Sequence, residues 1–135
     1  MRVLLVDDSR AMRSIVARIL RKIGISDIDE AADGQEALDR VKAGPVPDLA
    51  LVDWNMPVMN GLDFVISVRK ESEFRSMTIM MVTTENEHGQ IVRALAAGAH
   101  EYLIKPFDEE ALIDKLAILG FVGNLDEASS EQVHS

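Results

Sequence analysis

Polar side chains follow four short apolar stretches of the chain, and their types together could support phosphoryl chemistry. Asp7 and Asp8 follow RVLLV, Asp53 follows LALV, Thr83 ends MTIMMVT and Lys105 follows EYLI. A carboxylate at the tip of a buried strand is costly unless a cation compensates its charge. Ligands that are all oxygens select a hard cation such as Mg²⁺. The set therefore predicts a magnesium-assisted site in which Asp53 is the nucleophile.

The formal charges of this set balance. Three carboxylates, the Lys105 ammonium group and one Mg²⁺ sum to zero. A phosphoryl group arriving at Asp53 would then be bound by the cation, by Lys105 and by the Thr83 hydroxyl. Such a transfer depends mainly on positioning and on stabilising the charge of the phosphoryl oxygens. We expect the Asp53 carboxylate to attack phosphorus in line and form an acyl phosphate.

Each of these residues has a simpler interpretation when it is taken alone. Asp7 and Asp8 could cap a helix, Asp53 could be a turn residue, Thr83 could merely end a strand, and Lys105 could be an ordinary solvated lysine. A joint site requires an architecture in which the ends of these stretches meet. The carboxyl ends of parallel strands do meet, because they share one edge of the sheet.

Short apolar runs alternate along the chain with stretches of helical periodicity. Strands are predicted at residues 2–6, 27–32, 48–52, 77–83 and 100–104. Helices are predicted from an Asp8 or Ser9 cap to Gly24, at 34–43, 61–71 and 86–97, and from an Asp108 cap to about Leu119. Five strands alternating with five helices predict an α/β fold with a parallel sheet covered on both faces.

The composition limits the class of protein. The 135 residues fit one domain, which we place at 1–120, followed by a polar, acidic tail at 121–135 that we expect to be mobile. A net charge of −9 argues against a nucleic-acid-binding surface. There is no cysteine, and no apolar run is long enough for a membrane span. These features predict a cytoplasmic protein.

Four stretches of the sequence resemble those of a known family. VLLVDDS, DWNMPVMNG, MMVTTE and EYLIKPF, between residues 3 and 107, resemble the receiver domains of bacterial two-component response regulators, in particular the CheY-like single-domain chemotaxis regulators. The resemblance implies a flavodoxin-like, doubly wound sheet of order 2-1-3-4-5. It implies that Asp53 is the phosphoacceptor, with Asp8 as a direct Mg²⁺ ligand, Asp7 as a ligand mainly through water, and Asn55 as a ligand through its backbone carbonyl.

The resemblance also implies a conformational switch. Thr83 would be the switch hydroxyl, Lys105 would precede a cis bond to Pro106, and Tyr102 would turn inward when Thr83 is drawn to the phosphoryl group. The surface formed by helix 86–97, strand 100–104 and the last helix would then change. Beyond its own phosphorylation and dephosphorylation, such a protein has no enzymatic activity.

The partners implied by the resemblance are a histidine kinase or a histidine-phosphotransfer protein upstream, and a protein target downstream, with the flagellar motor switch as the leading candidate. The alternative role is a phosphate sink or relay intermediate. Asn55 and Glu85 match the pair that fast-hydrolysing chemotaxis members of the family carry, so the resemblance implies a short-lived acyl phosphate. Thr84 departs from the small Ala or Gly usual in the family, and its extra bulk leaves the lifetime of the acyl phosphate open.

Five basic residues lie opposite the apolar face of the first predicted helix. They could form a solvated face or a docking surface for an acidic phosphotransfer partner; they are Arg10, Arg13, Arg18, Arg21 and Lys22. Met56 and Met59, beside the site, could likewise pack against that partner or simply fill the loop.

Two other classes fit the sequence less well. A phosphatase with an aspartyl nucleophile needs an Asp-x-Asp motif after the first strand and a cap over the substrate, and neither is present in the sequence. A nucleotide-binding domain needs a glycine-rich loop after the first strand, where this chain has VDDSR.

Overall fold

Strands and helices alternate along the chain in the computed structural model, which describes residues 1–121. The strands are β1 (Arg2–Val6), β2 (Asp27–Ala31), β3 (Leu49–Val52), β4 (Thr78–Thr83) and β5 (Glu101–Ile104). The helices are α1 (Arg10–Lys22), α2 (Gly34–Ala43), α3 (Gly61–Arg69), α4 (His88–Ala97) and α5 (Glu109–Ile118), with a short 3₁₀ turn, η1 (Ser72–Phe74). The predicted tail lies outside the described residues except for Phe121.

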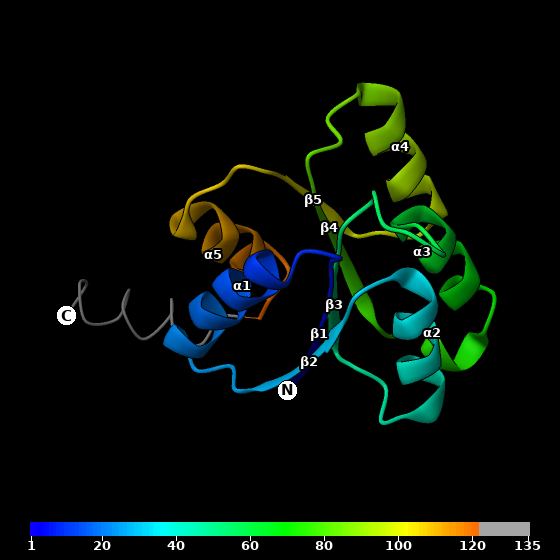
Figure 1. The fold of residues 1–135 in the computed structure, drawn as a ribbon, viewed down its shortest axis with the longest axis horizontal. Coiled ribbons are helices and arrows are strands. Elements are labelled where there is room, and N and C mark those ends of the chain that lie inside the picture. Colours follow the sequence, from blue (N-terminus) through cyan, green and yellow to red (C-terminus); the bar gives the residue numbers. More distant parts are fainter. Residues whose placement is uncertain (122–135) are drawn as a thin grey trace.

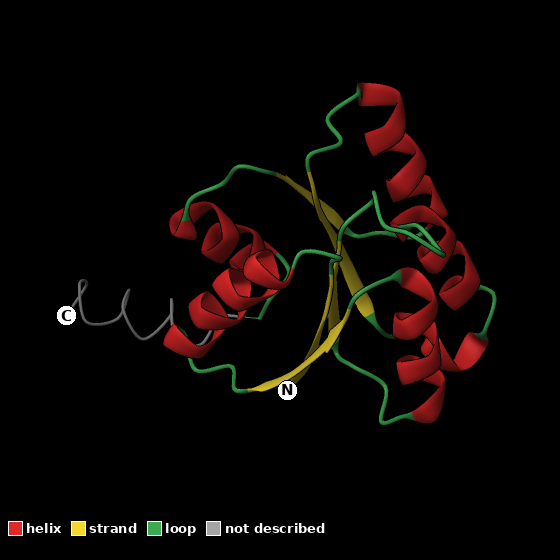
Figure 2. Ribbon diagram, in the orientation of Figure 1, coloured by secondary structure: helices red, strands yellow, loops and turns green. Residues whose placement is uncertain are grey.

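All neighbouring strands pair in parallel, in the order β2-β1-β3-β4-β5. This confirms the predicted α/β architecture and strand order. The helices α1 and α5 cover one face of the sheet, and α2, α3 and α4 cover the other (Figure 1). Figure 2 shows the strands edge-on between these two helical layers.

The core consists of two apolar clusters, one on each side of the sheet. Side chains alternate between the two faces of a strand, so Leu4 and Val6 pack beneath α2–α4 while Val3 and Leu5 pack beneath α1 and α5. The strands β3 and β4 are buried on both faces and are apolar over almost their whole length. The carboxyl ends of β1 and β3, which carry the acidic residues, therefore leave a densely buried part of the sheet.

Four of the helices begin at a side-chain cap. Ser9, Asp33, Asn60 and Asp108 each accept a hydrogen bond from the backbone N–H three residues further on. The exception is α4, where Glu87 makes no such bond. The prediction of a helix at 86–97 was wrong at its start, because the chain stays extended at Glu87 (ψ 134°) and the helix begins at His88. The loop before α4 is therefore longer than predicted.

The loop between β3 and α3 holds Val58 in a left-handed backbone conformation (φ 67°). A β-branched side chain is strained there, and this one is 82% exposed, so it gains no burial in return. We expect Val58→Asn to raise the free energy of unfolding by about 1 kcal/mol, since asparagine tolerates this region. Urea denaturation measures the change.

The matched control for this substitution is Val92→Asn, which changes a half-exposed valine on α4. We expect it to be neutral or destabilising, because asparagine is no better a helix former than valine. An equal gain in both variants would contradict the strain at Val58.

Among residues 1–121, none of the helices combines the length and the apolar composition needed to cross a lipid bilayer.

Candidate phosphoacceptor site

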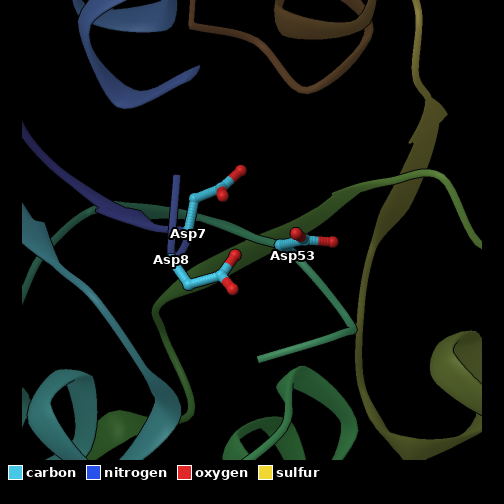
Figure 3. Close-up of side chains that lie close together, drawn as sticks. All are labelled: Asp7, Asp8 and Asp53. Atoms are coloured by element: carbon cyan, nitrogen blue, oxygen red, sulfur yellow. The ribbon is translucent and has the colours of Figure 1, made fainter. Parts of the chain in front are cut away.

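Three carboxylates converge at the carboxyl edge of the sheet. Asp7 and Asp8 follow β1 and Asp53 follows β3; Val6 and Val52 are paired in the parallel register, so the next residues leave the sheet side by side. One oxygen from each carboxylate lies within 4.8 Å of the others. Figure 3 shows the three side chains together. The structure thus brings together the acidic residues that the sequence predicted would meet.

Lys105 lies between two of these carboxylates. Its Nζ atom donates to Asp7 Oδ2 at 2.7 Å and to Asp53 Oδ2 at 3.4 Å. All three side chains are about one-tenth exposed, which excludes most of the water that would screen the interaction. The backbone N–H of Lys105 also donates to the Thr83 carbonyl, which ties the end of β5 to the end of β4. The peptide bond between Lys105 and Pro106 is cis, as the resemblance implied.

Backbone donors orient the same two carboxylates. Asp53 Oδ1 accepts from the N–H of Trp54 at 2.7 Å, and Asp7 Oδ1 accepts from the N–H of Ser9 at 2.8 Å. Each carboxylate is therefore held at one oxygen by the backbone and at the other by Lys105. The Asp8 carboxylate is exposed and projects beside them. This arrangement leaves acceptor capacity on all three groups.

The donor set fits a hard divalent cation. It consists of carboxylate oxygens from three residues that follow two adjacent strands, and the Lys105 ammonium group neutralises only part of their charge. Mg²⁺ prefers such oxygens and keeps several of its own waters, so a partly open site suits it. Asn55 is exposed two residues beyond Asp53, and its role as a carbonyl ligand stays a prediction.

The start of α3 packs directly against the phosphoacceptor candidate. A Cβ atom on Gly61 would overlap the carbonyl oxygen of Asp53, and the Gly61 N–H donates to the Trp54 carbonyl at 2.9 Å. Only glycine permits this approach. The Asn60-Gly61 pair therefore both caps α3 and fixes the backbone around Asp53.

Thr83 lies at the carboxyl end of β4 and is fully buried. Its hydroxyl oxygen accepts a hydrogen bond from the Glu85 N–H at 3.2 Å. Thr83 pairs with Ile104 in the register of β4 and β5, so it lies at the same edge of the sheet as Lys105. The hydroxyl is thus positioned at the edge that carries the carboxylates.

Tyr102 occupies an inward position. Its side chain is buried, and its hydroxyl donates to the Glu85 carbonyl at 2.7 Å. Burial and, to a smaller extent, the negative charges of Glu85 and Asp53 together raise the pKa of the Tyr102 hydroxyl to about 12. The hydroxyl therefore stays protonated at neutral pH and remains a hydrogen-bond donor to the loop before α4.

Sequence reasoning missed the contact that Arg13 makes with this site. Arg13 was grouped with the basic face of the first helix, but its side chain is only 15% exposed and donates to the Asp7 carbonyl and to Glu30. The other four members of that group are exposed, as a solvated face requires: Arg10, Arg18, Arg21 and Lys22. The available signal was Glu30, an acidic residue in a predicted strand that offers an ion-pair partner to a basic residue nearby.

Comparisons with known proteins agree with this geometry. A family model described as the response regulator receiver domain matches residues 3–117. The chemotaxis protein CheY1 of Helicobacter pylori is 41% identical over 119 residues, which cover 88% of this chain and 96% of that protein. A chemotaxis protein CheY homolog of Campylobacter jejuni is 42% identical over 116 residues, which cover 86% of this chain and 89% of that protein.

A solved structure agrees as well. The chemotaxis response regulator CheY4 of Vibrio cholerae superposes with a TM-score of 0.79 at 39% sequence identity, covering 86% of this chain and 95% of that one. The sheet order, the acidic cluster and the family match therefore lead to one conclusion. This chain belongs to the response regulator receiver domain family.

Proposed function

We propose that this protein is a phosphoacceptor switch in a two-component pathway, in which Asp53 takes a phosphoryl group from the histidine of a kinase or a phosphotransfer protein. The observation that carries the proposal is the contact of Asp53 with Lys105 inside a cluster of three carboxylates. In the transfer, an Asp53 carboxylate oxygen forms a bond to phosphorus while the bond from phosphorus to the histidine nitrogen breaks. The imidazole is the leaving group.

The residues around Asp53 have separate tasks in this reaction. Asp7, Asp8, Asp53 and the Asn55 carbonyl would hold Mg²⁺, which when bound neutralises the negative charge of the carboxylates and of the phosphoryl oxygens. Lys105 already donates to Asp53, and it would donate to a phosphoryl oxygen on Asp53. Stabilisation of this kind, from donors that are already oriented, is the main contribution a protein makes to phosphoryl transfer.

The signal would leave the site through Thr83 and Tyr102. A phosphoryl group on Asp53 would attract the Thr83 hydroxyl, which now accepts from the Glu85 N–H, and so would bias the loop that also holds the Tyr102 hydroxyl. This loop leads into α4. The surface formed by α4, β5 and α5 would change with it, and no further enzymatic activity is needed for the output.

The target would be a protein that binds this surface. Exposed apolar side chains on it, which a protein partner could cover, are Val92, Leu95, Ile104 and Ile118. The names of the similar proteins place them in chemotaxis, which supports chemotaxis for this chain. Within that role we propose the flagellar motor switch as the target. The phosphodonor would dock elsewhere, on the exposed basic residues of α1 beside a cavity of about 350 Å³ that Met12, Ile15 and Phe107 help to line.

Acetyl phosphate tests the proposed function without knowledge of the kinase. We expect the full chain incubated with acetyl phosphate and Mg²⁺ to gain one phosphoryl group by intact mass, and to gain none when a chelator removes Mg²⁺. Asp53→Asn should abolish the gain, because an amide is not a nucleophile of this kind.

The matched control is Asp63→Asn, which changes an exposed carboxylate on α3 and should label like the wild type. Labelling of Asp53→Asn at the wild-type level would refute Asp53 as the acceptor. Unlabelled wild-type protein in the presence of both reagents would refute the proposed function.

A further inference from the structure

Arg13 joins three segments beside the carboxylate cluster. It lies in the first turns of α1, its Nη1 atom donates to the Asp7 carbonyl oxygen at 2.6 Å, and its Nε atom donates to Glu30 Oε1 on β2 at 2.8 Å. The Arg13 side chain is 15% exposed, whereas that of Glu30 is 44% exposed. Two donors of one rigid, planar guanidinium group therefore act in different directions, which a lysine ammonium group on its flexible stem cannot reproduce.

The carbonyl that Arg13 holds belongs to the peptide between Asp7 and Asp8. The Asp7 side chain is fixed independently, at one oxygen by the Ser9 N–H and at the other by Lys105. The Asp8 carboxylate is exposed, and within residues 1–121 neither a backbone N–H nor a side chain donates a hydrogen bond to it. The direction in which Asp8 leaves the backbone therefore depends on the plane of the peptide that Arg13 holds.

We propose that Arg13, held in place by Glu30, is a positioning residue that orients the Asp7–Asp8 peptide so that the Asp8 carboxylate stays in the metal-binding cluster. This inference rests on the proposed function, because it presupposes that the cluster binds Mg²⁺. In this role Arg13 would contact neither the cation nor the phosphoryl group. It acts through the backbone that presents Asp8.

Charge and positioning predict opposite effects of removing Arg13. A guanidinium group near a cation site repels the cation, so its removal on grounds of charge alone would strengthen Mg²⁺ binding. Loss of positioning would instead weaken binding, because Asp8 would no longer be held toward the other two carboxylates. Partners that orient a metal ligand commonly contribute 10- to 100-fold to affinity. The sign of the change therefore separates the two explanations.

The experiment is a titration of the full chain with Mg²⁺, followed by calorimetry and by the fluorescence of Trp54, the single tryptophan, which directly follows Asp53. We expect Arg13→Met to weaken Mg²⁺ binding about 10-fold. Arg13→Lys keeps the charge but not the paired donors, so most of the loss should remain. The matched control, Arg10→Met, removes the same charge from an exposed position one turn earlier on α1 and should bind Mg²⁺ at least as tightly as the wild type.

Two variants of Glu30 test whether Glu30 holds Arg13 in place, and they leave Arg13 itself unchanged. Glu30→Gln and Glu30→Ala both remove the negative charge, but only glutamine keeps an oxygen that can accept from Arg13. We expect the glutamine variant to bind Mg²⁺ more tightly than the alanine variant. Because these substitutions are at a half-exposed position, they also keep the test decisive if Arg13→Met does not fold.

The outcomes are distinguishable from failure of the proposed function. Wild-type protein that binds no Mg²⁺ would refute the proposed function. Wild-type protein that binds Mg²⁺ while Arg13→Met binds it equally or more tightly would refute the positioning role, as would full recovery in Arg13→Lys. Equal affinities in the two Glu30 variants would also refute it.

Discussion

Lys105→Met is expected to slow phosphoryl uptake from acetyl phosphate by about 100-fold, the usual effect of removing one oriented donor from a charge-stabilising site. The same substitution should strengthen Mg²⁺ binding, because it removes a positive charge that now contacts both Asp7 and Asp53. The two effects run in opposite directions. Intact mass measured over time gives the first, and calorimetric titration with Mg²⁺ gives the second.

The matched control for this prediction is Lys70→Met, which removes an exposed lysine at the end of α3. It should alter neither the rate of uptake nor the affinity for Mg²⁺. If Lys105→Met took up phosphoryl groups at the wild-type rate, the proposed contact of Lys105 with the phosphoryl oxygens would be wrong. Weaker Mg²⁺ binding in that variant would show that Lys105 supports the arrangement of the carboxylates more than its charge opposes the cation.

Gly61→Ala is expected to lower the free energy of unfolding by about 3 kcal/mol. A methyl group at this position would overlap the Asp53 carbonyl oxygen, which is backbone and cannot rotate away as a side chain would. The loop between β3 and α3 would have to shift, and Asp53 with it. Urea denaturation followed by Trp54 fluorescence measures the loss, and Mg²⁺ titration should show weaker binding in the folded fraction.

The matched control is Gly89→Ala in α4, where a Cβ atom would meet nothing within 4 Å. That substitution should raise the free energy of unfolding by about 0.5–1 kcal/mol, because glycine within a helix is less favourable than alanine. The two glycine variants are thus expected to shift stability in opposite directions. A shift in the same direction in both would contradict the close approach of Gly61 to Asp53.

The architecture could be predicted from the sequence because its causes are local. The sequence contains apolar runs of strand length, stretches of helical periodicity, and capping residues such as Ser9 and Asp108. Each of these features appears in the structure close to its predicted place. The start of α4 was the exception. No side chain caps it at Glu87, so the sequence carried no marker for its first residue.

The meeting of the acidic residues could be predicted as well. Once the sheet is parallel, the strand ends that precede Asp7, Asp8 and Asp53 must share one edge, and the structure places their oxygens within 4.8 Å of one another. The residue types and their positions after predicted strands were sufficient to predict this cluster, because the topology of the fold brings each of these strand ends to the same edge of the sheet.

Individual contacts were decided only by the tertiary structure. Lys105 reaches across 98 residues of sequence to Asp7, and nothing near either residue specifies which oxygen it binds. Tyr102 was expected as a moving aromatic residue, and the structure adds that its hydroxyl is held by the Glu85 carbonyl.

Arg13 shows the physical reason most clearly. Its position on α1 placed it among basic residues that are mostly solvated. The helical periodicity of the sequence does not indicate which residue Arg13 contacts. The twist of the sheet and the packing of α1 bring it over the end of β1, where it meets the Asp7 carbonyl and Glu30 from β2. The sequence by itself determined which groups stand at the edge of the sheet; the packing of helices against strands decided which of them touch.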